Sequence, residues 1–436
     1  MSIGSSKTTM TVPLEEERNA SAAAETQDGK PIDVLCAFTK DPSCDFHIGK
    51  FQRRPVGDHD VLIDMMYCGV CHSDLHHAAN HNNKLKETPY PCVPGHELAG
   101  IVLKVGKGVS RVKVGDHVGV GCMVDACLEC KQCRASEEQK CSKGSVGTYG
   151  AKDKYGRATT WPPGQHTLGG YTSQTVVHEH FVVLVPKDYP LKYAGPVMCA
   201  GITMYDPLRA HKMGKGNCVA VIGLGGLGQM GLRLAKALGC HVVAISRRTT
   251  KRDLAINDCG ADEFVVSTNE SDMRRFYGSV DLLLNTIPSW HDYDPYFPLL
   301  STKGKQVILG LHKGIAAGVI LNKISSATRL TMSGIGGIRA TQEVIDLCAK
   351  NKIYPKIEVK PVSELNKIYS ALVDNTSGTR YVLDIKNTLN LEEEKNCVHP
   401  PPDLPEHAGG ISISGGLAEA CRLIWCCKAK ICCCFC

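Results

Sequence analysis

The sequence predicts an α/β protein with two domains, one resembling a β-barrel and one built around a doubly wound parallel sheet. A chain of 436 residues is too long for one ordinary hydrophobic core. Between residues 31 and 186, short Val- and Ile-rich runs such as 100–106 and 112–118 are closed by glycine turns, which is typical of antiparallel strands. From about residue 199 to 341, apolar strands alternate with amphipathic helical stretches, which indicates a parallel sheet with helices on both faces.

Composition excludes several classes of protein. Hydrophobic residues make up 43% and charged residues 22% of the chain, which fits a soluble globular enzyme. The 50 basic and 44 acidic residues are too evenly mixed for a nucleic-acid-binding surface, so we expect no such partner. No run of about 18 apolar residues occurs, and residues 1–30 lack the apolar core of a signal peptide. We therefore expect a cytoplasmic, reducing location, where clustered cysteines are more often metal ligands than disulfides.

The composition changes along the chain predict the domain limits. Residues 1–30 are rich in Ser, Thr, Ala and Glu without periodicity, so we expect a disordered N-terminal extension. Residues 31–195 form the first domain, which the β-rich segment within 345–388 completes, and residues 196–344 form the second. Residues 389–436 are a linker and a cysteine-rich tail. The strands expected in the second domain are residues 218–222, 241–245, 264–266, 281–284 and 306–309.

A glycine loop follows the first of these strands. It reads Gly-x-Gly-x-x-Gly and consists of Gly223, Leu224, Gly225, Gly226, Leu227 and Gly228. The helix that it opens has apolar residues at helical spacing, and another strand follows, which is the context of a dinucleotide-binding loop. Gly223 permits the tight turn, Gly225 admits the pyrophosphate, and Gly228 lets the helix pack on the strand. The alternative is a glycine-rich turn without a ligand.

The choice of cofactor depends on the end of the second strand, where an acid would hold the ribose of NAD. The chain has no acid there; it has Ser246, Arg247, Arg248 and, three residues later, Lys251. Guanidinium groups and a hydroxyl suit a phosphate, so the sequence predicts NADPH. The alternative is that both arginines are simply solvated.

Cys127, Cys130, Cys133 and Cys141 have the spacing of a closed four-thiolate zinc site, with no position open for substrate. An iron–sulfur cluster or a set of reactive thiols is the alternative. A catalytic zinc needs three ligands and one open position, and the candidates are Cys71, His96 and Cys199. Spacing alone does not connect these three residues, and a buried cysteine such as Cys199 is more often a core residue.

Taken together, these motifs resemble those of the zinc-dependent medium-chain alcohol dehydrogenases, and within them the cinnamyl alcohol dehydrogenase and NADPH-dependent aldehyde reductase branch. The resemblance covers residues 34–389. It rests on the four-cysteine loop, the glycine loop, Gly95-His96-Glu97 and three further segments, which are residues 71–76, 199–203 and 334–343. It implies a GroES-like β-barrel catalytic domain, a Rossmann domain that binds NADP, two Zn²⁺ ions per chain and a homodimer.

The resemblance also implies roles for residues. Cys71, His96 and Cys199 would hold the catalytic zinc, with Glu97 as an occasional fourth ligand and Asp74 orienting the ligands. Ser73 and His76 would form the proton relay, while His77 and His81 would have no chemical role. Thr203 and the loop with Gly334 and Ile335 would contact the nicotinamide. The loop at 78–90 and the run at 246–248 depart from the family pattern, which leaves the natural substrate open.

Residues 421–436 hold seven of the 23 cysteines together with three basic residues and no acid. Cysteines among basic and apolar residues are what S-acylation uses, and the last three residues resemble a prenylation signal, so the tail predicts membrane association. A metal-scavenging tract and a segment without a role are the alternatives.

The function expected from all this is reversible reduction of aldehydes to primary alcohols by hydride transfer from NADPH at a zinc centre. One alternative is a catalytically silent sensor or interaction protein that binds NADPH and zinc and is tethered by the tail. A second alternative is zinc-free reduction of an activated carbon–carbon double bond. The intact set of ligand and relay residues favours the dehydrogenase.

Overall fold

The computed structural model describes residues 29–81, 87–157, 161–162, 164–289, 291–310, 329–373 and 379–391. Most of the predicted N-terminal extension and all of the cysteine-rich tail lie outside the described residues, so those predictions stay predictions. Within the described part of the chain, every helix is too short or too polar to cross a bilayer.

One domain is organised by a six-stranded parallel sheet. Its strand order is β12-β11-β10-β13-β14-β15, so the chain runs outward from the centre first to one edge and then to the other. This order is that of a dinucleotide-binding sheet, with the reversal between β10 and β13. The strands are β10 (Cys218–Ile222), β11 (His241–Ser246), β12 (Glu263–Val266), β13 (Val280–Asn285), β14 (Leu300–Ile308) and β15 (Leu330–Met332). The doubly wound α/β fold and its five predicted strands are confirmed.

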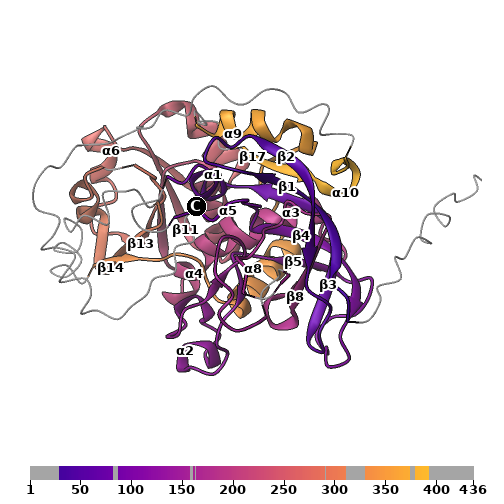
Figure 1. Ribbon diagram of the computed structural model, residues 1–436. Helices are drawn as coiled ribbons and strands as arrows, with labels where there is room; N and C mark the ends of the chain where they lie inside the picture. The colour runs from indigo at the N-terminus through magenta and orange to yellow at the C-terminus, as the bar shows by residue number, and fades with distance from the viewer. Residues whose placement is uncertain are drawn as a thin grey trace, which may run out of the picture.

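The helices of this domain and of the connection into it are α3 (Leu191–Pro196), α4 (Ile202–Ala210), α5 (Gly226–Ala237), α6 (Glu270–Arg274) and α8 (Ile338–Lys350). The predicted amphipathic pattern of α5 is seen directly, because Leu227, Met230 and Leu234 are all buried. In Figure 1, β13, β14 and α6 lie at the left, β1 to β4 at the right, and α4, α5 and α8 between them. The helical layer therefore lies between the parallel sheet and the second sheet.

The second sheet has seven strands in the order β16-β17-β3-β4-β5-β9, with β8 also paired to β3. Its strands are β3 (Asp60–Val70), β4 (Glu97–Val105), β5 (His117–Val120), β8 (Gln174–His178), β9 (Val183–Leu184), β16 (Ile357–Lys360) and β17 (Arg380–Asp384). All pairs except β16–β17 are antiparallel. The late strand β17 pairs with the early strand β3, so residues from both ends of the fold build one sheet.

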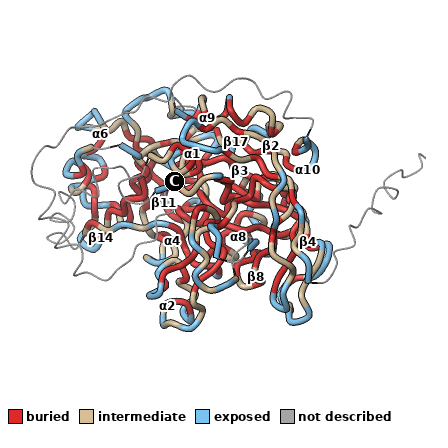
Figure 2. The backbone as a smooth tube through the Cα atoms, viewed as in Figure 1, coloured by how far each residue is buried: buried red, intermediate tan, exposed pale blue. Residues whose placement is uncertain are grey.

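Smaller elements surround this sheet. They are the pair β1 (Ile32–Thr39) and β2 (Phe46–Arg53), the pair β6 (Met123–Asp125) and β7 (Val146–Gly147), and the helices α1 (His72–Ala78), α2 (Lys131–Arg134), α9 (Leu365–Val373) and α10 (Ile385–Thr388). Figure 2 shows that buried residues follow both sheets and the helices between them, whereas the chain around α6 is largely exposed and the chain around α2 mixes exposed and buried residues.

A glycine turn was expected within residues 112–118, and the structure has one at Gly115 and Asp116. Strand β5 begins directly after it, at His117. The Asp116 carboxylate accepts a hydrogen bond from the backbone N–H of Lys113 (3.0 Å), and the Asp116 N–H donates to the Lys113 carbonyl (3.1 Å). These bonds close a turn, in which the Val114 side chain is 60% exposed.

Candidate active site

Four side chains from three separate segments converge on one buried point. Cys71 follows β3 and caps the start of α1, His96 and Glu97 stand at the start of β4, and Cys199 lies in the π-helical turn Val197–Gly201. Their ligand atoms all lie within 4.8 Å of one another. Pairing of β3 with β4 brings Cys71 and His96 together, and the turn that precedes α4 supplies Cys199.

Asp74 holds this cluster in place. Its fully buried carboxylate accepts hydrogen bonds from Nδ1 of His96 (2.8 Å), the backbone N–H of Cys71 (2.9 Å) and the backbone N–H of Gly95 (3.2 Å). Burial opposes its charge, but His96 and these hydrogen bonds outweigh burial and lower the pKa of Asp74. Because Nδ1 is engaged, the other ring nitrogen, Nε2, faces Cys199 Sγ at 3.2 Å, as a metal ligand would.

The donor set fits zinc. Two cysteine sulfur atoms, an imidazole and a carboxylate at this separation match the ligands and size of a four-coordinate zinc site. Glu97 is fully buried, and its Oε2 atom has no hydrogen-bond partner among the described residues, while Oε1 accepts from Arg380 of β17. Burial raises the pKa of Glu97, and Arg380 offsets part of that rise. An unpartnered buried carboxylate oxygen beside two thiols is costly unless a cation satisfies it.

The second cluster is the four-cysteine loop. The sulfur atoms of Cys127, Cys130, Cys133 and Cys141 lie within 4.8 Å of one another, and Cys127 and Cys133 are 3.8 Å apart. The short helix α2 carries Cys133 and begins directly after Cys130. Four thiols that close a tetrahedron leave no position for substrate, which is the chemistry of a site that stabilises a loop.

The glycine loop has the shape that a dinucleotide needs. Gly223 has φ +86°, which an L residue rarely adopts, and a Cβ on Gly228 would lie 1.9 Å from the Gly223 carbonyl oxygen. A Cβ on Gly225, by contrast, would meet nothing within 4 Å, so this face is open. Helix α5 begins at Gly226, and its free N–H groups therefore point toward the open side of the loop.

Cationic and hydroxyl groups gather at the end of β11. Ser246 ends the strand, its Oγ accepts from the Arg248 N–H (3.3 Å), and both Arg247 and Arg248 are exposed. Lys251 reaches back to the glycine loop, where Nζ donates to the Leu224 carbonyl (3.3 Å). Among the predicted phosphate contacts, Lys251 therefore lies directly against the glycine loop.

The predicted nicotinamide contacts come from two other segments. Thr203, on α4, is buried, and its Oγ1 has no hydrogen-bond partner among the described residues. Gly334 has open space where a Cβ would be, and Ile335 is 8% exposed. Thr203 lies four residues after Cys199, because α4 directly follows the π-helical turn that carries Cys199.

Comparisons with known proteins agree with this geometry. The alcohol dehydrogenase GroES-like domain family matches residues 57–187, and the zinc-binding dehydrogenase family matches residues 226–350. A mannitol dehydrogenase from Petroselinum crispum is 40% identical over 344 residues, which cover 79% of this chain and 98% of that protein.

Two solved structures extend the likeness to the fold. A cinnamyl alcohol dehydrogenase from Sorghum bicolor is 33% identical with a TM-score of 0.72, covering 82% of this chain and 99% of that one. The cinnamyl alcohol dehydrogenase of Helicobacter pylori, complexed with NADP(H), is 35% identical with a TM-score of 0.72, covering 82% and 100%. The chain belongs to the zinc-type medium-chain alcohol dehydrogenase family. The predicted family, its cinnamyl alcohol dehydrogenase-like branch and its two-part fold are confirmed.

In this dehydrogenase the two residues expected to relay protons differ in exposure. Ser73 is in α1, two residues after Cys71, and its Oγ is buried without a hydrogen-bond partner among the described residues. His76 is exposed one turn later, and its Nδ1 lies 3.0 Å from Nδ1 of His81. We expected no chemical role for His81, and its contact with His76 could not be read from the sequence spacing.

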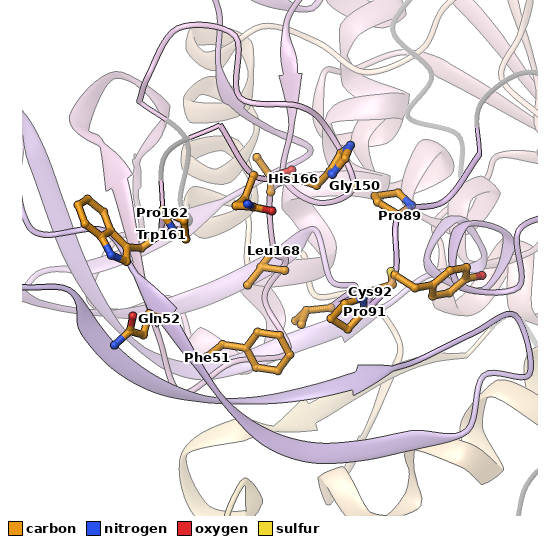
Figure 3. Close-up of a pocket in the computed structure, with 14 residues that line it drawn as sticks. Phe51, Gln52, Pro89, Pro91, Cys92, Gly150, Trp161, Pro162, His166 and Leu168 are labelled. Carbon is orange, nitrogen blue, oxygen red and sulfur yellow. The ribbon is translucent and has the colours of Figure 1, made fainter.

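A cavity of about 190 Å³ in this dehydrogenase lies beside β2. Figure 3 shows Phe51, Leu168 and Pro91 around it, with Trp161 at one end. None of the residues predicted for catalysis, cofactor or metal lines it. The candidate active site is therefore defined by the ligand cluster and the glycine loop.

Proposed function

We propose that this dehydrogenase reduces aldehydes to primary alcohols, reversibly, with NADPH as hydride donor and zinc as Lewis acid. The observation that carries the proposal is the convergence of Cys71, His96 and Cys199, oriented by Asp74, close to Thr203 on the helix that follows Cys199. When bound, zinc would polarise the carbonyl oxygen and the cofactor would supply the hydride. We propose two such ions per chain, one in this cluster and one in the four-cysteine loop.

NADPH is proposed over NADH because of the charges at the end of β11. Arg247, Arg248 and Lys251 are cationic, Ser246 offers a hydroxyl, and no acid stands at the strand end. Guanidinium groups bind phosphate by charge-assisted, bidentate hydrogen bonds, whereas a free ribose hydroxyl gains little from them. The NADP(H) complex of the Helicobacter pylori relative supports the same choice.

The chain's own residues would handle the proton. Ser73 has a buried hydroxyl without another partner among the described residues, so it is free to donate to the substrate oxygen. His76 is exposed and would exchange the proton with solvent. Ser73 therefore acts inside the site and His76 at its edge.

The domain limits, oligomeric state, location and tail of this dehydrogenase are also proposals. We propose the two-domain division at residues 31–195 with 345–388 and at 196–344, a homodimer, and a cytoplasmic location. We also propose that the cysteine-rich tail adds a membrane attachment through lipidation. Acyl-exchange labelling of the expressed chain tests the last proposal, because an unmodified tail would end it.

The decisive experiment measures NADPH oxidation by the purified protein against aliphatic, benzylic and cinnamyl aldehydes, with NADH in parallel. Turnover that prefers NADPH and is lost in the presence of a zinc chelator is the expected result. Absence of turnover from protein that retains zinc and binds NADPH would instead support the silent sensor. Turnover that persists without bound zinc would support reduction of a carbon–carbon double bond.

A further inference from the structure

A buried carboxylate in the four-cysteine loop contacts the loop that precedes α8. Glu138 lies between Cys133 and Cys141, is fully buried, and was not singled out from the sequence. Its Oε2 accepts a hydrogen bond from the backbone N–H of Ile338 (3.0 Å), although the two residues are 200 positions apart. Its Oε1 is 2.8 Å from Nε2 of His180.

This carboxylate caps a helix that cannot cap itself. The N-cap residue of α8 is Gly337, which has no side chain to accept from the first N–H groups. Glu138 supplies that acceptor from another part of the chain, and its negative charge also lies at the positive end of a 13-residue helix. Burial disfavours the charge, but the hydrogen bonds from His180 and Ile338 outweigh burial and lower the pKa of Glu138.

Two neighbouring contacts tighten the same junction. The Ser136 carbonyl oxygen is so close to Gly337 that a Cβ there would lie 2.0 Å away, and Arg339 donates to the Ala135 carbonyl (3.3 Å). Residues 135, 136 and 138 thus all contact residues 337–339. The cysteine ligands at 133 and 141 fix both ends of the contacting segment once zinc is bound.

The loop that precedes α8 also contains the proposed cofactor contacts. Gly334 and Ile335 precede Gly337 by three and two residues and are the proposed nicotinamide contacts. A Cβ on Gly336 would lie 2.5 Å from Cδ1 of Ile202, so this loop also packs directly against α4. A shift of the first turn of α8 would therefore move the residues that face the nicotinamide.

We propose that Glu138 is a positioning residue through which the four-cysteine zinc site sets the affinity for the cofactor. The proposal rests on the proposed function, because it takes residues 334–335 as cofactor contacts. The zinc in the loop then does more than stabilise the fold: it holds Glu138 where its carboxylate fixes the backbone of residues 337–339. If the four-cysteine loop is loosened, the affinity for the cofactor falls while the rate of the chemical step stays close to wild type.

The test compares Glu138→Ala, Glu138→Gln and His180→Ala with the matched control Glu137→Ala in full-length protein loaded with zinc. Glu137 is the adjacent residue, and its exposed side chain forms a 3.2 Å ion pair with Lys140. Cofactor affinity is measured by the fluorescence of bound NADPH, and the loop by hydrogen exchange of the peptide spanning residues 334–341. Metal content and kcat are measured alongside.

Glu138→Ala is expected to raise the Kd for NADPH about tenfold, the change that loss of one hydrogen bond to a charged group produces. Exchange at residues 334–341 should accelerate, while kcat and bound zinc stay near wild type. Glu138→Gln, which keeps an acceptor for Ile338, should recover most of the affinity, and Glu137→Ala should match wild type. If Glu138→Ala does not fold, His180→Ala carries the test, because that ring is 33% exposed and its loss should raise the Kd in the same direction.

An unchanged Kd in both Glu138→Ala and His180→Ala, or an equal loss in Glu137→Ala, would overturn the role of Glu138 while leaving the proposed function intact. Faster exchange with unchanged affinity would also overturn it. Wild-type protein that fails to bind NADPH at all would reject the proposed function and this proposal together.

Discussion

Asp74 and His96 are 22 residues apart in sequence, yet a 2.8 Å hydrogen bond joins the carboxylate of one to Nδ1 of the other in the interior of the protein. The same carboxylate accepts a hydrogen bond from the backbone N–H of Cys71, so a single side chain positions two of the proposed metal ligands. Tyr171 also donates to it (3.3 Å), and Tyr369 in turn donates to Tyr171 (3.4 Å). The orientation of the cluster therefore depends on a chain of buried groups that extends to α9.

Asp74→Asn should weaken zinc binding at the catalytic cluster about 10- to 100-fold, as is typical when the group that orients a histidine ligand is changed. The reason is that an amide can no longer accept from His96 and both backbone N–H groups as a charged carboxylate does. Zinc loss to a competing chelator, followed against time, measures the effect. Asp58→Asn, at an exposed ion pair with Lys107, is the control, and equal zinc retention by both variants would refute the role of Asp74.

Gly225→Ala should abolish most NADPH binding with little loss of stability. The added Cβ meets nothing within 4 Å and the backbone there is extended, so the fold tolerates it, but the methyl group stands where the pyrophosphate must approach. Cofactor titration together with a thermal melt separates the two effects. Gly214→Ala, at another uncrowded glycine in the same domain, should change neither measurement.

Replacing Arg247 and Arg248 together by alanine should raise the Kd for NADPH about 10- to 100-fold, since each charge-assisted hydrogen bond to phosphate contributes roughly 1.5–3 kcal/mol. The Kd for NADH should hardly change, because that cofactor lacks the phosphate. Arg274→Ala removes an exposed arginine that pairs with Glu270 and Tyr277 on the surface of the same domain, and it serves as the control. A parallel loss of both cofactors in the double variant would contradict the assignment.

Arg380→Ala should lower the free energy of unfolding by about 3–5 kcal/mol, the usual cost of removing one partner of a buried ion pair. Its partner Glu97 is fully buried and would keep its carboxylate without the compensating guanidinium. Urea unfolding of the zinc-loaded protein measures the change. Arg274→Ala, which breaks an exposed pair, should leave the free energy of unfolding close to that of the wild type. If Arg380→Ala lowers the free energy of unfolding no more than Arg274→Ala does, Glu97 is stabilised in another way.

The sequence predicted local features better than distant ones. The four cysteines of the loop lie within 15 residues, and the glycine loop stands between a strand and a helix, so spacing alone was informative. Cys71, His96 and Cys199 are brought together only by the pairing of β3 with β4 and by the turn before α4. No local pattern encodes that pairing, and family resemblance supplied the prediction.

The residues that sequence reasoning missed have a common cause. Glu138 looked like one more acid in a charged loop, and its partner Ile338 lies 200 residues away. His81 was treated as a solvated loop residue, although its ring contacts His76. Both contacts depend on where the folded backbone places the two side chains, which no pattern in the sequence encodes.

The pairing of β17 with β3 has a consequence for how the protein is made. Tyr381 pairs with Val70, the residue before Cys71, and Arg380 donates a hydrogen bond to Glu97. The proposed zinc ligands are therefore held in place partly by residues 380–384. During synthesis, the ribosome exposes β3, which ends at Val70, about 310 residues before its partner strand β17 begins at Arg380. The nascent chain must therefore carry an open sheet edge and an unfinished thiol site through most of translation, which is the period when aggregation and oxidation threaten it most.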